Sequence, residues 1–297
     1  MLGEVFKVIL DPEQIKAKKE KLGARRFEIQ LLKNDIGNNT RLIEKFSGCI
    51  SLFDDIVSVH TALAPSDSLP PEGDCDLKYL YDRNTLSAIR DACAIADLAA
   101  TNYGHSVGVV IHNSLSYREF SECPYYNTLV TSFIGDLLRD YKGVEIWIEN
   151  VTPIHMGECI HLKNGCITDS SDIARHLREI FGNRIGSVFD VCHAVITHRM
   201  LKEITGKSVL ADIYKGFSDT CKEVHFANAK EFGMKPGQHG CGFREDNEKD
   251  VEELKTYLFL CMTYFPAAYL CYEISEKDYI KCDAVSETLK IIQKLHN

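Results

Sequence analysis

The sequence predicts a single (β/α)8 barrel of 297 residues, and three observations lead to this prediction. Eight short apolar runs of β-strand character recur along the chain, and stretches with helical spacing of apolar residues separate them. The length accommodates one barrel, a fold of about 250 residues. A content of 45% hydrophobic and 26% charged residues is that of a globular chain able to bury a large core. Strand and helix alternating eight times favour a closed barrel over an open doubly wound sheet.

The eight candidate strands are apolar runs bounded by turn residues. They cover residues 5–10, 26–32, 56–60, 107–112, 144–149, 186–190, 222–226 and 268–273. The chain contains no Pro-, Gly- or Ser-rich linker that would divide it into halves. We therefore expect residues 1–297 to form one domain.

Three of the helices between these strands have clear apolar patterns. One begins its apolar positions at Leu86, after a polar capping residue at 84–85. A second begins at Ile173, after the capping cluster 169–171, and the third covers the C-terminal segment 283–296. The other inter-strand stretches have a mixed pattern that does not define helix ends.

Two insertions interrupt the repeat. Residues 64–80 form a Pro-rich, acidic loop after the third strand, and residues 151–168 follow the fifth strand. The second insertion alternates around Asn164-Gly165, which predicts a small β-hairpin. Both insertions follow the carboxyl ends of strands, the rim on which barrel active sites are built.

Metal-capable side chains stand at or near the ends of six predicted strands. These residues are His60, His112, Glu149, Asp190, His225 and Glu273, and His193 and His239 follow the sixth and seventh strands. Carboxylates packed together in a partly buried rim repel one another, and bound cations relieve that repulsion. Imidazole and carboxylate groups are ligands of zinc, manganese and iron alike. We therefore predict a metal site at the C-terminal rim of the strands.

Charge and composition also bear on partners and compartment. The 43 acidic and 34 basic residues give a net charge of -9, which disfavours nonspecific binding to polyanions. The longest apolar stretch, residues 258–272, contains Pro266 and falls short of the roughly 20 residues that cross a bilayer. Twelve cysteines without an N-terminal export signal indicate reduced thiols. We expect a cytoplasmic protein without a membrane partner.

The motifs around these polar residues resemble the xylose isomerase-like TIM-barrel superfamily, and within it most closely the endonuclease IV family of apurinic/apyrimidinic endonucleases. The resemblance runs from about His60 to Glu273. Its motifs are Ile148-Glu149-Asn150, Asp190-Val191-Cys192-His193, His225-Phe226-Ala227-Asn228-Ala229-Lys230, Gln238-His239 and Tyr272-Glu273. Each motif is weak alone, and their order is moderately specific for the superfamily.

The resemblance implies divalent metal ions, two in number and zinc, or else manganese or iron, with no organic cofactor. The implied first site comprises His60, His112 and Glu149. The implied second site comprises Glu149, Asp190, His225 and Glu273, so that Glu149 bridges the two. A third site would use His193, an Asp and His239, but Gly237 stands where the family has that Asp. The third site therefore lacks its carboxylate.

The function that the resemblance favours is metal-dependent phosphodiester hydrolysis, with DNA containing an abasic site as the partner and DNA repair as the role. Clustered cations supply a nucleophilic hydroxide, neutralise phosphate oxygens and stabilise the leaving alkoxide. Glu149, Glu273 and His193 are the expected catalytic residues of this hydrolase. We expect His239, Asn228 and Lys230 to contact the substrate.

Two alternatives remain open at this point. A sugar isomerase or epimerase would use Glu149 and Glu273 as bases at one cation held also by Asp190 and His225, with a small sugar as its substrate. The acidic loop residues Asp67, Glu72, Asp74 and Asp76 favour this alternative, because they would repel a DNA duplex. The second alternative is a degenerate barrel without catalysis. The oligomeric state is left open.

Overall fold

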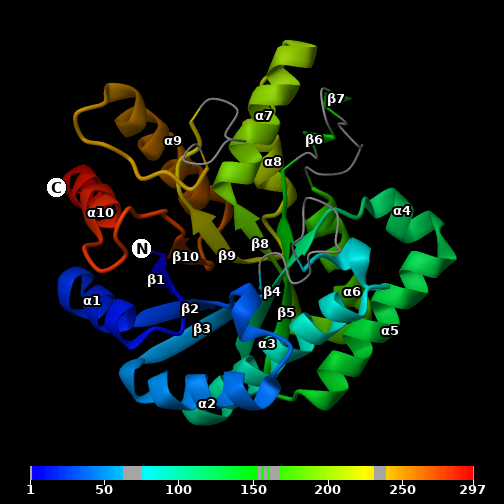
Figure 1. The fold of residues 1–297 in the computed structure, drawn as a ribbon. Coiled ribbons are helices and arrows are strands. Elements are labelled where there is room, and N and C mark those ends of the chain that lie inside the picture. The colour runs from blue at the N-terminus through cyan, green and yellow to red at the C-terminus, as the bar shows by residue number, and fades with distance from the viewer. Residues whose placement is uncertain are drawn as a thin grey trace.

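The computed structural model describes residues 2–62, 75–152, 155–156, 159–160, 168–230 and 239–296. Eight parallel strands close into a barrel in the order β1-β10-β9-β8-β5-β4-β3-β2, with helices around it (Figure 1). The strands are β1 (Gly3–Val8), β2 (Arg26–Gln30), β3 (Asp55–His60), β4 (Val107–Asn113), β5 (Val144–Asn150), β8 (Ile185–Asp190), β9 (Cys221–Phe226) and β10 (Tyr269–Tyr272). The predicted (β/α)8 barrel is confirmed, and each predicted strand coincides with an observed one.

The described residues form ten α-helices, of which the last follows the final strand. They are α1 (Pro12–Leu22), α2 (Asn39–Cys49), α3 (Arg83–Tyr103), α4 (Tyr117–Glu122), α5 (Pro124–Asp140), α6 (Asp169–Phe181), α7 (Val191–Thr205), α8 (Leu210–Gly216), α9 (Glu248–Tyr264) and α10 (Asp283–His296). The three predicted helices correspond to α3, α6 and α10. The N-cap of α3 is Asp82, whose side chain accepts a hydrogen bond from the Thr85 amide, so the predicted cap at 84–85 lies within the helix. The predicted capping cluster 169–171 likewise forms the first turn of α6.

The insertion after β5 contains a short antiparallel pair, β6 (His155–Met156) and β7 (Cys159–Ile160). The hairpin predicted around Asn164-Gly165 lies outside the described residues. The insertion after β3 is described from Cys75 onward, where Asp76 forms an isolated parallel bridge with His112. This bridge places the end of the acidic loop beside the end of β4.

The barrel interior is apolar in one layer and polar in the next. Five side chains of the apolar layer are Val5, Val110, Trp147, Val188 and Cys271. Side chains two residues apart on a strand point to the same face of the sheet. The residues two positions further along these strands are Lys7, His112, Glu149, Asp190 and Glu273. The outer faces of the strands pack against the helices in the main apolar core. Burial on both faces explains the nearly continuous apolar runs in the sequence.

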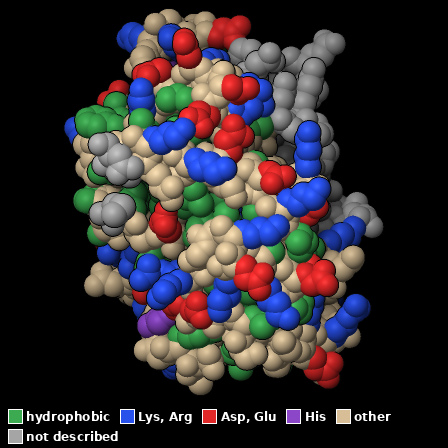
Figure 2. All heavy atoms as spheres, turned by 90° about the vertical axis from the view of Figure 1, so that its left-hand side faces the viewer, with side chains coloured by type: hydrophobic (Ala, Val, Ile, Leu, Met, Phe, Trp, Pro, Cys, Tyr) green, Lys and Arg blue, Asp and Glu red, His purple; other side chains and the backbone are tan. Residues whose placement is uncertain are grey.

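The surface drawn in Figure 2 belongs to the side of the molecule that lies on the left of Figure 1. On the described part of this face, Lys and Arg side chains are interspersed with Asp and Glu. Opposite charges at this spacing give a polyanion no extended basic surface there. Among the described residues, no helix combines the length and apolar composition needed to cross a bilayer.

The packing of Trp147 in the interior predicts the effect of one glycine substitution. A Cβ atom at Gly108 would lie 2.4 Å from the Trp147 ring, so we expect Gly108→Ala to lower the free energy of unfolding by about 1–3 kcal/mol. Urea denaturation measures this change. Gly48→Ala is the matched control, because a Cβ atom there meets nothing within 4 Å and Gly48 lies in α2. We expect the control to be neutral or stabilising by about 0.5–1 kcal/mol. Equal stability of the two variants would contradict the observed packing.

Candidate metal centre

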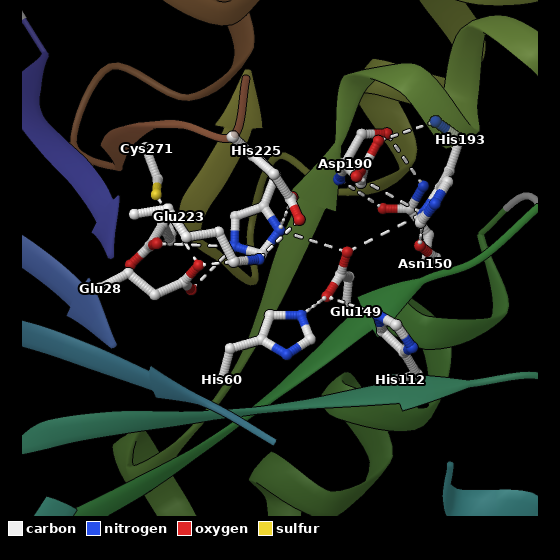
Figure 3. A network of polar contacts seen from close by, with 12 residues as sticks. Glu28, His60, His112, Glu149, Asn150, Asp190, His193, Glu223, His225 and Cys271 are labelled. Carbon is white, nitrogen blue, oxygen red and sulfur yellow. Dashed lines mark hydrogen bonds and ion pairs between the residues drawn. The ribbon is translucent and has the colours of Figure 1, made fainter. Parts of the chain in front are cut away.

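Glu149 lies at the middle of the polar layer, close to His60, His112 and His225, and His193 Nδ1 lies 3.8 Å from its Oε1 atom (Figure 3). Its Oε2 atom lies 3.0 Å from His60 Nε2 and 3.3 Å from His112 Nε2. Its Oε1 atom lies 3.2 Å from His225 Nδ1. Burial opposes ionisation of this carboxyl, but the charges of His225 and His112 hold its pKa well below its usual range. Glu149 is therefore a buried carboxylate that requires positive partners.

His225 joins Glu149 to two further carboxylates. Its Nδ1 atom faces Glu149 and also lies 2.8 Å from Glu273 Oε2, while its Nε2 atom lies 2.9 Å from Glu28 Oε2. Burial lowers the pKa of His225, but Glu28, Glu149 and Glu273 together raise it well above its ordinary value. Four ligand atoms, one each from Glu149, Asp190, His225 and Glu273, all lie within 4.8 Å of one another.

The hydrogen bonds of two rings indicate that a cation fits among these groups. The carbonyl oxygen of Thr61 can only accept, so His60 donates to it from Nδ1 at 2.9 Å. A neutral His60 would then direct the Nε2 lone pair at Glu149. A neutral His225 would meet the same repulsion between a lone pair and a carboxylate. If its ring donates from Nε2 to Glu28, its Nδ1 lone pair is directed at Glu149 and Glu273. Either protons or a bound cation must neutralise these contacts.

The Glu273 side chain supplies a further sign of this fit. Its Oε2 atom is buried and has no hydrogen-bond partner among the described residues, although it lies beside His225. A buried carboxylate oxygen loses solvation, and here either a protonated His225 or a bound cation can compensate for that loss. Imidazole and carboxylate donors at this spacing suit a divalent cation held by Glu149, Asp190, His225 and Glu273.

A second group of ligand atoms lies on the other side of Glu149. Atoms of His60, Glu149 and His225 lie within 4.8 Å of one another. The implied first site comprised His60, His112 and Glu149. The structure brings all three into contact, but His225 completes the compact group while His112 approaches Glu149 Oε2 at 3.3 Å. These ligand assignments remain predictions.

The Asp190-x-x-His193 motif has a local structural cause. Asp190 ends β8 and caps α7, because its side chain accepts a hydrogen bond from the His193 amide at 2.8 Å. His193 Nδ1 in turn donates to the Asn150 carbonyl at 2.7 Å. The Asn150 amide also pairs with the Asp190 backbone, accepting from its N–H at 2.8 Å and donating to its carbonyl at 3.1 Å. These bonds hold the ends of β5 and β8 in register beside Glu149.

Of the residues implied for the third site, His193 and His239 lie together with their rings stacked. The centroids of His193 and His239 lie 4.8 Å apart, and His239 Nε2 is buried without a hydrogen-bond partner among the described residues. Gly237, the position that departs from the family pattern, lies outside the described residues. Ligand atoms of Asp190, Cys192 and His239 lie within 4.8 Å of one another.

The predicted substrate contacts differ in their surroundings. Asn228 is buried, pairs with Cys241 through the backbone, and leaves its Oδ1 atom without a partner among the described residues. Lys230 is exposed at the end of a described range. Both substrate roles stay predictions.

Sequence reasoning missed three charged residues beneath the centre. Lys7 Nζ lies 3.0 Å from Glu28 Oε1 and 2.6 Å from Glu273 Oε1. Ser58 lies between Glu28 and Glu223, and donates to Glu223 Oε2 at 2.9 Å. Burial and the nearby Glu28 charge raise the pKa of Glu223 to about 7. The sequence signal that could have identified Lys7, Glu28 and Glu223 is that each is a charged residue within a predicted strand of the barrel.

Solved structures share this fold at low sequence identity. A xylose isomerase domain protein from Planctomyces limnophilus has a TM-score of 0.61 and 12% identity, covering 100% of this chain and 98% of that chain. A D-allulose 3-epimerase from Methylomonas sp. has a TM-score of 0.55 and 12% identity, covering 99% and 98%. A xylose isomerase-like TIM barrel protein from Mycobacterium smegmatis, in complex with magnesium, has a TM-score of 0.52 and 12% identity, covering 99% and 97%.

These comparisons show that the chain shares its TIM-barrel fold with proteins described as xylose isomerase-like. No family model matches the sequence, and no curated protein sequence matches it. Special closeness to endonuclease IV stays a prediction.

The position of Glu149 predicts how metal ions affect stability. We expect Mn2+ or Zn2+ to raise the unfolding temperature of chelator-treated protein, because a ligand at 100 times its Kd stabilises the folded state by about 2.7 kcal/mol. Glu149→Gln should lose most of this shift, which differential scanning fluorimetry measures. Glu145→Gln is the control, because Glu145 lies earlier on β5 and contacts Trp147 and Lys222 instead of the centre. Equal metal-induced shifts in the two variants would refute the assignment of Glu149.

Proposed function

We propose that this protein is a metal-dependent isomerase or epimerase acting on a small sugar or sugar phosphate. The observation that carries the proposal is the pair of carboxylates around His225. Glu149 and Glu273 approach the same Nδ1 atom at 3.2 and 2.8 Å, from strands that β8 and β9 separate in the barrel. The D-allulose 3-epimerase and the xylose isomerase domain protein described above have the same fold, which supports this reaction class.

The chemistry follows from the carboxylates. A divalent cation held by Glu149, Asp190, His225 and Glu273 would polarise the carbonyl and hydroxyl oxygens of a bound sugar. Glu149 or Glu273 would then take the proton from the carbon next to the carbonyl, and the C–H electron pair would pass onto the carbonyl oxygen to give an enediolate. Return of that proton to the former carbonyl carbon, with transfer of the hydroxyl proton to the former carbonyl oxygen, would give the isomer. Return to the original carbon from the opposite face, by the other carboxylate, gives the epimer.

Charge also favours a small substrate over a DNA duplex. The net charge of the chain is -9, and the backbone of Asp76, a residue of the acidic loop, forms a β-bridge with His112 at the rim. Phosphate contacts dominate the affinity of proteins for DNA, so acidic groups at the mouth oppose duplex binding. The stacked rings of His193 and His239 offer one side of the centre as a surface for a sugar.

The second candidate is phosphodiester hydrolysis of the endonuclease IV type. The observation in its favour is the contact of His60 and His112 with a single oxygen of Glu149, since a one-metal isomerase has no coordination need for both rings. A second cation there would suit activation of water against a phosphodiester.

Two assays separate these candidates. Protein loaded with Mn2+ or Mg2+ should exchange the proton next to the carbonyl of ketohexoses in D2O, and loss of the corresponding 1H NMR signal measures the rate. Glu273→Gln should slow exchange by about 10^2-fold or more, because it removes a general base. Glu145→Gln should exchange at the wild-type rate.

The opposite outcome is also defined. Metal-dependent nicking of an oligonucleotide with an abasic site, without proton exchange in any ketose, would replace the isomerase proposal by the hydrolase. Metal binding with neither reaction would identify a non-catalytic barrel.

A further inference from the structure

We infer that Glu28 is a positioning residue of the metal centre and determines which ring nitrogen of His225 faces the cation. The inference rests on the proposed function only in requiring a cation at this centre. Glu28 comes from β2, a strand that contributes no residue to the proposed ligand set. Figure 3 shows Glu28 and Glu149 on opposite sides of the His225 ring.

The two nitrogens of His225 have different partners. The side chain is 0% exposed, so each nitrogen must find its partner within the protein. Nε2 lies 2.9 Å from Glu28 Oε2, and Nδ1 faces Glu149 and Glu273. Donation from Nε2 to Glu28 leaves the lone pair on Nδ1, directed at the centre. Carboxylates that accept from the second nitrogen of a ligating histidine hold the ring in this way.

Glu28 is itself held by two neighbours. Lys7 contacts Glu28 Oε1 at 3.0 Å, and Ser58 Oγ lies 3.3 Å from Oε2. The same ammonium contacts Glu273 Oε1 at 2.6 Å. Lys7 thus engages one oxygen of each carboxylate, which leaves Oε2 of Glu28 for His225 and Oε2 of Glu273 for the centre.

The other acid in this layer is less suited to the role. Glu223 Oε1 lies 3.6 Å from His225 Nε2, which is too long for a hydrogen bond. Ligand atoms of Glu28, Glu223, His225 and Cys271 also lie within 4.8 Å of one another. The Lys7 ammonium already supplies a positive charge to this group, and the proton on Nε2 occupies the nitrogen that a second cation would need. The geometry therefore favours a hydrogen-bonded support over another metal site.

Nuclear magnetic resonance of the wild-type protein tests the inference directly. In protein labelled with 15N-histidine and loaded with 113Cd2+, the His225 signal, assigned with His225→Asn, should show 113Cd coupling at Nδ1 and a proton on Nε2. Coupling at Nε2, or binding of none of Mn2+, Zn2+ and Cd2+ by the wild type, would overturn the inference.

Variants at position 28 test the consequence for affinity. Glu28→Met removes the acceptor at nearly constant volume, and we expect Mn2+ binding, measured by electron paramagnetic resonance, to weaken by about 10- to 100-fold. Glu28→Gln keeps an oxygen acceptor and should weaken binding less. Glu145→Gln is the control, because Glu145 contacts Trp147 and Lys222 and has no contact with Glu28, His225 or Glu273 among the described interactions. Its affinity should match the wild type.

The outcomes separate this inference from the proposed function. Wild-type Mn2+ affinity in a folded Glu28→Met variant would refute the positioning role. If the variant does not fold, the coupling pattern of the wild type decides. A protein that binds Mn2+ with the expected order of affinities but exchanges no proton in ketoses refutes the isomerase proposal and leaves the role of Glu28 intact.

Discussion

Glu149 is buried at the centre of the barrel mouth, and its negative charge needs compensation that solvent cannot give. Glu28, Asp190 and Glu273 add three more carboxylates around it, and Lys7 contacts two of these, Glu28 and Glu273. Histidine protons or divalent cations must supply the remaining positive charge. This requirement links the identity of the rim residues to the proposed chemistry, because a cation that neutralised the acids would also activate a bound substrate.

The strand geometry explains how one sequence provides both a core and a reactive centre. Inward positions alternate along each strand, so an apolar side chain such as Trp147 is followed two residues later by Glu149. The apolar layer closes the barrel from below. The next layer opens to the rim, where polar groups gain partners from neighbouring strands. On each such strand, one inward-facing residue packs in the apolar core, and the next inward-facing residue, two positions later, belongs to the candidate metal centre.

Much of this arrangement was predictable from the sequence. Alternating apolar runs and helical segments determine the barrel, and the metal-capable residues at strand ends determine the rim, because parallel strands in a closed barrel end on one side. Lys7 and Glu28 were not anticipated. Their roles depend on which residues of distant strands they face, and residue spacing within one strand carries no information about that pairing. The cap of α3 was misplaced for a local reason, since several polar residues precede that helix and only backbone geometry selects Asp82.

The side chain of Asn150 has a consequence for how this scaffold can vary. Backbone pairing between β5 and β8 extends to Glu149 and Val188, and beyond that point the Asn150 amide continues the connection by bonding both backbone groups of Asp190. This side-chain rung ties the two strand ends together, and Ser170 at the start of α6 adds a hydrogen bond from its hydroxyl to the Glu149 carbonyl at 2.9 Å. The length of the insertion between Asn150 and α6 can therefore diverge through evolution or engineering, provided that Asn150 and Ser170 are kept, while the two strand ends keep their places.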